Sequence, residues 1–417
     1  MNVKLLLVKT GIIFSIVIGS ILVLLGLISI ILYISAPKMV KPKREIKNSH
    51  ELDQYLQLIT KNNTPPAISV SVFKNGSSVY EKAFGYLDPD KIKQADVNTG
   101  FAWWSATKLF TATAVFQLVE RYDFDIDRKV SDYLEYFHPV DKNGNSYDIT
   151  IRHLLMHQSG LPSMVPDLLS WLRFQDEAPV NQSEFYKKKY PGYSTLNFKP
   201  GTKSKYTNNA YLALGAVIET VTGISYEDYV AENILVPLGM NKSGFVRTPE
   251  MLSNFAEPST ALISIYTPLV ILIIKDWFDK YVTKTVHGRT WMKKIYTLYT
   301  PSTGLNGPAH DLSKIGIVLL NKGEQNGIRI LSKDNVDLML NIFPKGEPGK
   351  KNNPQLGLGW KRWKEKGVTF IGHAGGGPGY GAQLAVIPEK NIVISFVGND
   401  GDLNKRVLLN TIAGIDW

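Results

Sequence analysis

Strand-like patterns near both ends of the chain, separated by helical patterns, constrain the fold of this sequence most strongly. Residues 67–86 alternate apolar and polar side chains about Asn75-Gly76, a dipeptide that favours a tight hairpin turn. Three more antiparallel strands are predicted over residues 368–374, 381–388 and 391–398. Helical patterns occupy residues 51–59, 105–121, 150–157, 209–222 and 402–415. We therefore expect an α+β fold in which both chain ends form one antiparallel sheet and an all-α part is inserted between them.

The expected organisation is a tail, a membrane anchor, a linker and one large domain. These cover residues 1–10, 11–35, 36–48 and 49–417, respectively. Within the large domain we expect an α/β part, a helical part and an insert that combines an apolar run with basic residues. These parts cover residues 49–104 with 300–417, 105–255, and 256–299.

The anchor is predicted from the absence of charge over residues 11–35. These 25 positions are enough for a helix to cross the roughly 30 Å hydrocarbon core of a bilayer. A cleavable signal peptide has an apolar core of only about 7–15 residues, and here Pro37 follows Ala36 where cleavage would be sought. We therefore predict an uncleaved, single-pass anchor. More basic residues lie in 36–48 than in 1–10, so the positive-inside rule places the large domain in the cytoplasm.

Composition excludes several kinds of site. The chain has no cysteine, which rules out disulfides, thiolate nucleophiles and cysteine metal ligands. Its net charge is +10, and several basic residues flank apolar segments. No nucleic-acid recognition module is visible, so this charge favours a membrane surface over DNA or RNA as a partner.

Ser105 and Lys108 lie three positions apart in FAWWSATKLF, residues 101–110. If a helix begins at Ser105, Lys108 projects from the same face one turn later. A lysine kept neutral by burial could take the serine proton, whereas an ammonium would stabilise the alkoxide electrostatically. The alternative is a surface lysine that follows a helix-capping serine.

Two further stretches supply groups that a hydrolase needs. Tyr206 and Asn208 lie two positions apart and could shuttle a proton or orient a substrate, although Asn at a helix entry is also a common cap. His373 is followed by a small residue and by glycines, which let a substrate approach a strand edge closely.

Together these motifs resemble those of the penicillin-recognising serine hydrolases. The matching residues, in order, are Ser105-Ala-Thr-Lys108, Tyr206-Thr-Asn208 and His373-Ala-Gly375. The sequence is most similar to the branch with class C β-lactamases, D-alanyl-D-alanine carboxypeptidases, serine esterases and LACTB-like proteins. Residues 149–162, 200–208 and 222–240 support the resemblance, which covers roughly residues 50–400. It implies a β-lactamase/transpeptidase-like fold.

The resemblance also implies roles for these residues. Ser105 would be the acylated nucleophile and Lys108 its activating partner. Tyr206 would act as general base or acid, with a phenol pKa lowered from about 10 by the neighbouring ammonium. Asn208 would orient Lys108 and contact the substrate amide, and Gly376 would complete an oxyanion hole with the backbone N–H of Ser105.

His373 and Gly375 would also contact the substrate, but the third motif departs from its usual form. His373 stands where many relatives carry lysine, and Ala374 where they often carry a hydroxyl. This departure argues against strong carboxylate recognition and favours the peptidase and esterase branch.

Two motifs that suggest other chemistry are better explained structurally. His153 and His157 have the spacing of a metal pair, but no suitable third ligand is evident and they fall in a family structural segment. GGGPG, residues 375–379, is not followed by a helical pattern, so it is not a dinucleotide-binding loop. No metal or organic cofactor is implied.

The insert suggests a second contact with the bilayer. Its apolar run, residues 261–274, is too short to span a membrane. Basic residues follow at Lys275, Lys280, Lys284, Arg289, Lys293 and Lys294. One hypothesis is that residues 261–294 lie at the membrane interface with these side chains on anionic headgroups. The alternative is a helix or lid packed on the protein core.

Taken with the predicted anchor, the resemblance implies a membrane-anchored serine hydrolase that acts through an acyl-enzyme on Ser105. Expected substrates are D-amino-acid peptides or related esters and amides. Alternatives are a β-lactamase proper and a slowly deacylating penicillin-binding or sensor protein. Anchored relatives mostly act on the cell envelope, so the resemblance favours an extracytoplasmic domain, against the charge count.

Overall fold

The computed structural model describes residues 38–164, 172–174, 180–261, 281–344, 349–350 and 352–417, with residues 19–20 and 23–24 near the N-terminus. The predicted anchor over 11–35 therefore lies almost wholly outside the described residues. Among the residues that are described, no helix is both long and apolar enough to cross a membrane.

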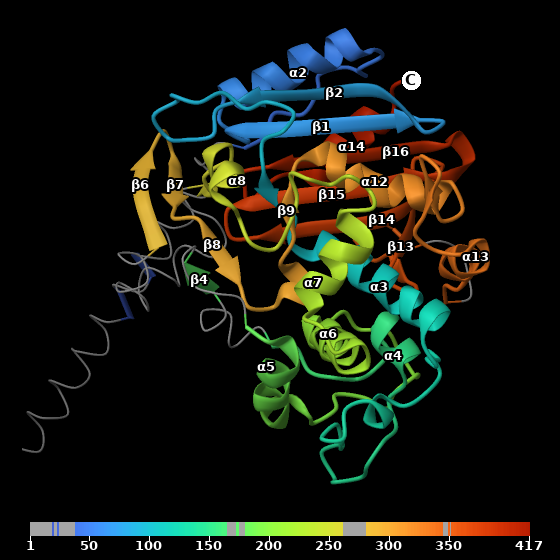
Figure 1. Cartoon of the computed structure of the whole chain (residues 1–417). Coiled ribbons are helices and arrows are strands. Elements are labelled where there is room, and N and C mark those ends of the chain that lie inside the picture. The colour runs from blue at the N-terminus through green and yellow to red at the C-terminus, as the bar shows by residue number, and fades with distance from the viewer. Residues whose placement is uncertain are drawn as a thin grey trace, which may run out of the picture.

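A seven-stranded antiparallel sheet forms the centre of the fold, in the order β12-β13-β14-β15-β16-β1-β2 (Figure 1). Its strands are β1 (Ala67–Lys74), β2 (Ser77–Gly85), β12 (Gln355–Leu356), β13 (Lys361–Glu365), β14 (Val368–Gly377), β15 (Tyr380–Ile387) and β16 (Ile392–Gly398). The first strand pairs with the last, with Ile68 opposite Gly398. This confirms the sheet built from both chain ends, the hairpin about Asn75-Gly76 and the three C-terminal strands.

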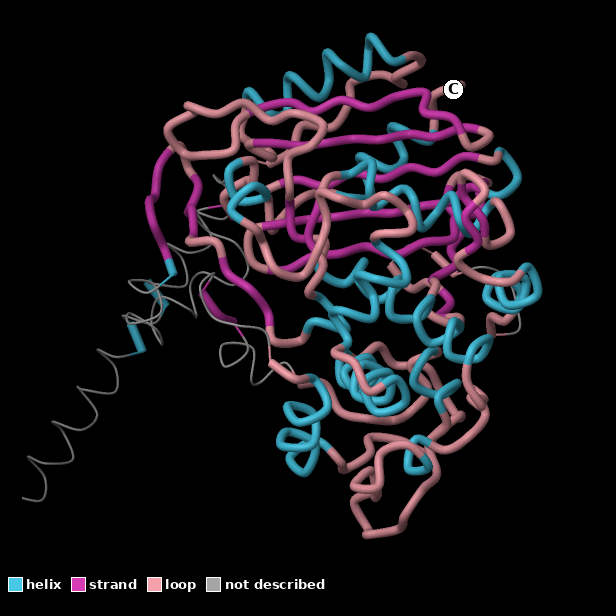
Figure 2. Tube along the Cα trace, in the orientation of Figure 1, coloured by secondary structure: helices cyan, strands magenta, loops and turns pink. Residues whose placement is uncertain are grey.

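Helices cover both faces of this sheet. On one face, α2 (Ser49–Lys61) and α14 (Lys405–Ala413) contribute Leu52, Leu56 and Leu408 to a core that also contains Ile68 and Val70 of β1. The other face of the sheet packs on α12 (Ala309–Leu320) and on the helical part of the chain, and Figure 2 shows the strands as a layer beside these helices. The central strands are buried on both faces, as their nearly continuous apolar runs require.

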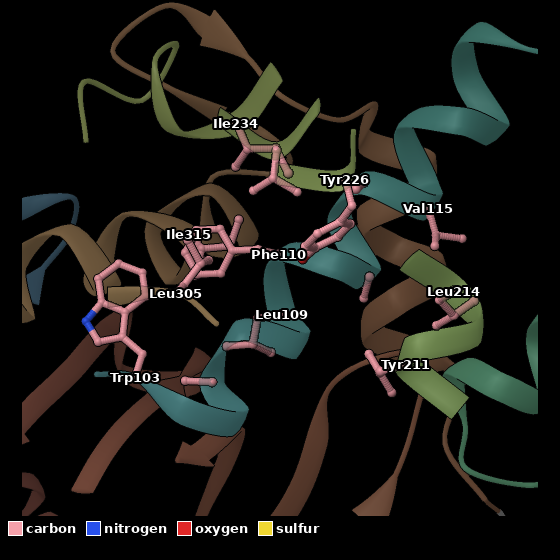
Figure 3. Close-up of a cluster of buried hydrophobic side chains, with 14 of the residues drawn as sticks. Trp103, Leu109, Phe110, Val115, Tyr211, Leu214, Tyr226, Ile234, Leu305 and Ile315 are labelled. Carbon is pink, nitrogen blue, oxygen red and sulfur yellow. The ribbon is translucent and has the colours of Figure 1, made fainter. Parts of the chain in front are cut away.

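The helical part is built around α3 (Lys108–Arg121) and α6 (Asn208–Thr222). Leu109 and Phe110 of α3 lie in the apolar cluster drawn in Figure 3, with Tyr211 and Leu214 of α6 and side chains from several other elements. Around them are α4 (Ile151–Leu155), α5 (Gln182–Lys189), α7 (Tyr226–Val230) and α11 (Thr300–Thr303). The five helices predicted within residues 49–417 are all present, with ends shifted by a few residues.

The remaining elements are short. They are α8 (Pro249–Ser253), α13 (Lys333–Asn341), β3 (Phe101–Ala102), β4 (Leu172–Phe174), β8 (Ile295–Thr297), β9 (Asn306–Gly307), β10 (Glu324–Gln325) and β11 (Ile328–Arg329).

The described parts of the predicted insert form a small sheet. It contains β5 (Ser259–Ala261), β6 (Val282–Val286) and β7 (Arg289–Met292), while residues 262–280, which hold most of the apolar run, lie outside the described residues. Arg289 is buried, forms an ion pair with Asp400 at 2.6 Å and donates to Ser259 Oγ at 3.0 Å. The hypothesis that Arg289 contacts lipid headgroups is therefore wrong, because its guanidinium is used inside the protein.

Candidate active site

Ser105 lies on a 3-10 turn, η1 (Trp104–Thr107), that leads directly into α3. The turn is held in place by Trp103, whose backbone N–H donates to Leu305 O and whose indole N–H donates to Gly307 O, both at 2.9 Å. Trp104 has a φ of +47°, in the left-handed region that bulky residues rarely adopt. A strained residue thus directly precedes Ser105, as is common where a structure presents a reactive group.

Lys108 is the first residue of α3, and its side chain is completely buried. Its Nζ lies 3.3 Å from Ser105 Oγ, 2.8 Å from Asn208 Oδ1 and 2.8 Å from the carbonyl oxygen of Ser302. Burial lowers the pKa of Lys108 well below its ordinary value, with a further contribution from the charge of Lys361.

These contacts fit a neutral amine. Such a group has two N–H donors and one lone pair, and the two oxygens at 2.8 Å are both acceptors for the donors. In the neutral form the lone pair would face the third neighbour, the Ser105 hydroxyl, whereas an ammonium would donate to that oxygen as well. The surface-lysine alternative is excluded by the burial of Lys108, and the lowered pKa favours the neutral base over the ammonium.

Tyr206 and Asn208 lie at the start of α6. The helix is capped by Thr207, whose side chain accepts from the backbone N–H of Asn209. The interpretation of Asn208 as the cap is therefore wrong, and its side chain is free to accept from Lys108. The structure thus joins two predicted site residues that are far apart in the sequence.

The predicted lowering of the Tyr206 pKa is also wrong. Burial raises the pKa of this phenol above its ordinary value, because the hydroxyl is removed from water and has no hydrogen-bond partner among the described residues. Lys361 Nζ and Lys108 Nζ lie 4.2 Å and 5.1 Å from the ring centre, but the loss of water around the hydroxyl outweighs any effect of their charge on the pKa. Tyr206 is therefore a neutral phenol at physiological pH.

The glycines after His373 allow β14 to touch the turn that carries Ser105. A Cβ on Gly375 would lie 1.9 Å from the carbonyl oxygen of Trp103, and one on Gly377 would lie 2.6 Å from the Trp104 ring. The pairing of β14 with β13 ends at Gly372, so residues 373–377 have a strand partner on one side only among the described residues. This leaves the strand edge that was expected for an extended substrate, and Gly376 lies on it.

His373 is buried, and burial lowers its imidazole pKa well below the ordinary value. Its Nδ1 lies 2.7 Å from the carbonyl oxygen of Ala374, so Nδ1 carries the hydrogen and donates. Nε2 then has a lone pair and no hydrogen-bond partner among the described residues. His373 is thus a neutral acceptor, which agrees with the expectation that it does not itself bind a carboxylate.

His153 and His157 both have structural partners. His153 Nδ1 accepts from the backbone N–H of Thr150, and His157 Nδ1 accepts from that of Thr207. His157 also packs its ring 4.4 Å from that of Tyr206. Among the described residues no cluster of three or more histidine or acidic side chains could hold a metal ion. His157 instead positions the loop that carries Tyr206, a role that its sequence spacing did not reveal.

Lys361 is the other site residue that sequence reasoning missed. It comes from β13, and its Nζ lies 4.2 Å from the centre of the Tyr206 ring. No spacing relative to the three motifs points to it, because its position depends on the pairing of β13 with β14.

Comparison with known proteins identifies the family of the chain. A family model described as Beta-lactamase matches residues 52–414. Protein flp of Staphylococcus aureus (strain N315) is 30% identical over 203 residues, which are 48% of this chain and 39% of that protein. This match therefore spans less than half the length of that relative.

Two longer matches cover most of the chain. A putative D-alanyl-D-alanine carboxypeptidase of Salmonella heidelberg (strain SL476) is 26% identical over 375 residues, 84% of this chain and 82% of that protein. The octameric penicillin-binding protein homologue from Pyrococcus abyssi superimposes with a TM-score of 0.67 at 25% identity, covering 88% of this chain and 78% of that one.

Proposed function

Because the chain belongs to the Beta-lactamase family of serine hydrolases, we propose that it transfers an acyl group to water through an acyl-enzyme on Ser105. The observation that carries the proposal is the contact between the Ser105 hydroxyl and a buried Lys108 whose other two neighbours are both acceptors. This arrangement supplies the nucleophile and its base in one place.

In the acylation step, Ser105 Oγ attacks the substrate carbonyl carbon while its proton passes to Lys108 Nζ. The carbonyl oxygen becomes an oxyanion, and the backbone N–H groups of Ser105 and Gly376 are the proposed donors to it. Support for this pairing comes from the close packing of β14 on η1, which only glycine permits at residue 375.

Breakdown of the tetrahedral intermediate expels the leaving atom, which needs a proton. A neutral Tyr206 is suited to donate it, because its raised pKa keeps the hydroxyl protonated. The proton taken by Lys108 then returns through water to the phenol oxygen, so that Lys108 and Tyr206 both regain their starting protonation states. In the second half-reaction water attacks the ester carbonyl carbon and gives a proton to Lys108, which passes it to Ser105 Oγ as the acyl bond breaks.

The proposed substrates are D-amino-acid peptides or related esters and amides. The name of the Salmonella relative supports a peptide ending in D-alanyl-D-alanine. The free edge of β14 supports an extended acyl chain, since its backbone groups have no strand partner on that side among the described residues.

Intact-mass measurement with penicillin, beside a neutral ester assay, tests the proposal. We expect a penicillin-sized mass gain and ester hydrolysis in the wild-type protein, and neither in Ser105→Ala. Rapid loss of the penicillin adduct would identify a β-lactamase. An adduct that persists for a long time would identify a peptidase or a penicillin sensor. Ester hydrolysis that survives in Ser105→Ala would reject the proposal.

We further propose that residues 11–35 anchor the chain in the cell membrane with the catalytic domain outside the cytoplasm. The length of the uncharged run supports the anchor. The outer side is supported by the family resemblance, because the anchored relatives mostly act on the cell envelope. A reporter that is active in one compartment only, fused after Trp417, tests the orientation. Activity of a cytoplasmic reporter would contradict it.

A further inference from the structure

Two lysine side chains converge on Tyr206 from different elements. Lys108 Nζ, from α3, lies 5.1 Å from the centre of the ring, and Lys361 Nζ, from β13, lies 4.2 Å from it. Lys361 pairs with Gly372 at the last paired position of β13 and β14. Lys361 therefore lies next to residue 373, where the unpaired edge of β14 begins.

The groups that face Lys361 carry no negative charge. They are Lys108 from α3, Tyr206 ahead of α6, His157 after α4 and His373 on β14. Burial alone lowers the pKa of Lys361, to about 8, and no acidic group opposes this. Within the described part of the chain, Lys361 thus has no carboxylate partner, whereas the exposed Lys82 pairs with Asp53.

The two lysines differ in charge at neutral pH. Lys361 is mainly protonated below pH 8, while Lys108 has its pKa held far below the ordinary value by burial and by the field of Lys361. His373 is neutral. The site therefore holds one neutral base and one ammonium, and the ammonium lacks a counter-ion.

A partly buried ammonium without a counter-ion is costly, and a carboxylate from a ligand would offset that cost. We propose that Lys361 binds a carboxylate of the substrate and so selects substrates that carry a free carboxylate near the bond to be cleaved. This deepens the proposed function and rests on acylation of Ser105. It revises the expectation that histidine rather than lysine at residue 373 argues against strong carboxylate recognition, because a lysine from the neighbouring strand supplies the charge.

The geometry explains how one substrate reaches both groups. Its acyl chain lies along residues 373–377, and its carboxylate extends toward the β13 end of that edge, where Lys361 stands. A charge-assisted hydrogen bond there contributes about tenfold or more to acylation.

The test compares penicillin with penicillin methyl ester, which differ only in the carboxylate. The measured quantity is the second-order rate of mass gain on Ser105 for each compound. We expect the wild-type protein to prefer penicillin by about tenfold or more, and Lys361→Met to abolish most of that preference. Lys361→Arg keeps the charge and should restore part of it. Lys364→Met is the matched control, since it removes an exposed lysine from the same strand and should retain the wild-type ratio.

Each outcome decides the proposal. An equal loss for both compounds in Lys361→Met would show that Lys361 only adjusts Lys108, and a wild-type protein that does not prefer the carboxylate would overturn carboxylate binding. If Lys361→Met does not fold, the wild-type preference should decline as the pH rises above 8, and a constant preference would overturn the inference. If the wild-type protein hydrolyses a neutral ester no faster than Ser105→Ala does, the proposed function itself would be rejected.

Discussion

Gly375→Ala tests how closely β14 must approach the turn that carries Ser105. The added Cβ would lie 1.9 Å from Trp103 O and 2.9 Å from its carbonyl carbon, and both atoms belong to the backbone. Side-chain rotation cannot relieve such a contact. Real Cβ atoms stay at least 3.0 Å from their neighbours, so the strand or the turn must move by more than 1 Å.

The expected effect on catalysis is large because Trp103 precedes the nucleophile by only two residues. A misplacement of about 1 Å between reacting groups costs about 100-fold in rate. Crowding of a packed core costs about 1–3 kcal/mol of stability, so the variant should still fold. We therefore expect kcat/KM for a neutral ester to fall about 100-fold, with a melting temperature that is lower but still well defined.

The assay combines thermal unfolding with ester hydrolysis in the same preparation. Gly192→Ala is the control, because a Cβ at that position meets nothing within 4 Å and should change neither readout. A folded Gly375→Ala protein with activity within about threefold of wild type would refute the argument that this contact positions Ser105.

Three other predictions concern buried ionisable groups. Lys108→Met should lower kcat/KM for a neutral ester by about 10²–10⁴-fold, the usual size of a general-base effect, and a loss below tenfold would argue for another base. In the wild type, the same kcat/KM should rise with pH as Lys108 loses its proton and reach its plateau well below pH 10.5. An activity that still rises near pH 10.5 would contradict the neutral base. Glu227 accepts hydrogen bonds from Gln182 and Thr300, and burial raises its pKa from 4.5 to about 7. Between these two pH values the folded protein keeps a proton on Glu227 that the unfolded chain has released. Its contribution therefore reduces stability as pH rises through that window, and Glu227→Gln should be more stable than wild type by up to about 3 kcal/mol at pH 8 but not at pH 4. Denaturant unfolding at both pH values checks this, and an equal difference at the two would contradict it.

Local patterns were sufficient to predict the N-terminal hairpin, the three C-terminal strands and five of the helices. The hairpin about Asn75-Gly76 and the C-terminal strands follow from turn residues and apolar runs, and the structure has them at those positions. β13 was missed because its sequence, KRWKE, is mostly charged and lacks a strand-like apolar pattern. Without β13, the position of Lys361 could not be inferred.

From the residues alone, only contacts within a single short motif of the site could be predicted. Ser105 and Lys108 are close because they are three residues apart, but the contact between Lys108 and Asn208 spans 100 residues and was expected from the family resemblance alone. The pKa of Tyr206 and the burial of Arg289 depend on how tightly neighbouring segments enclose them. The sequence around these residues does not contain that information.

Mapping the acylated residue tests the central claim most directly. The protein would be reacted briefly with penicillin, digested, and its peptides fragmented in a mass spectrometer to locate the added mass. We predict that the adduct lies on Ser105 and that Lys108→Met greatly slows its formation. An adduct on any other residue, or one that forms on Ser105 at the wild-type rate without Lys108, would contradict the account.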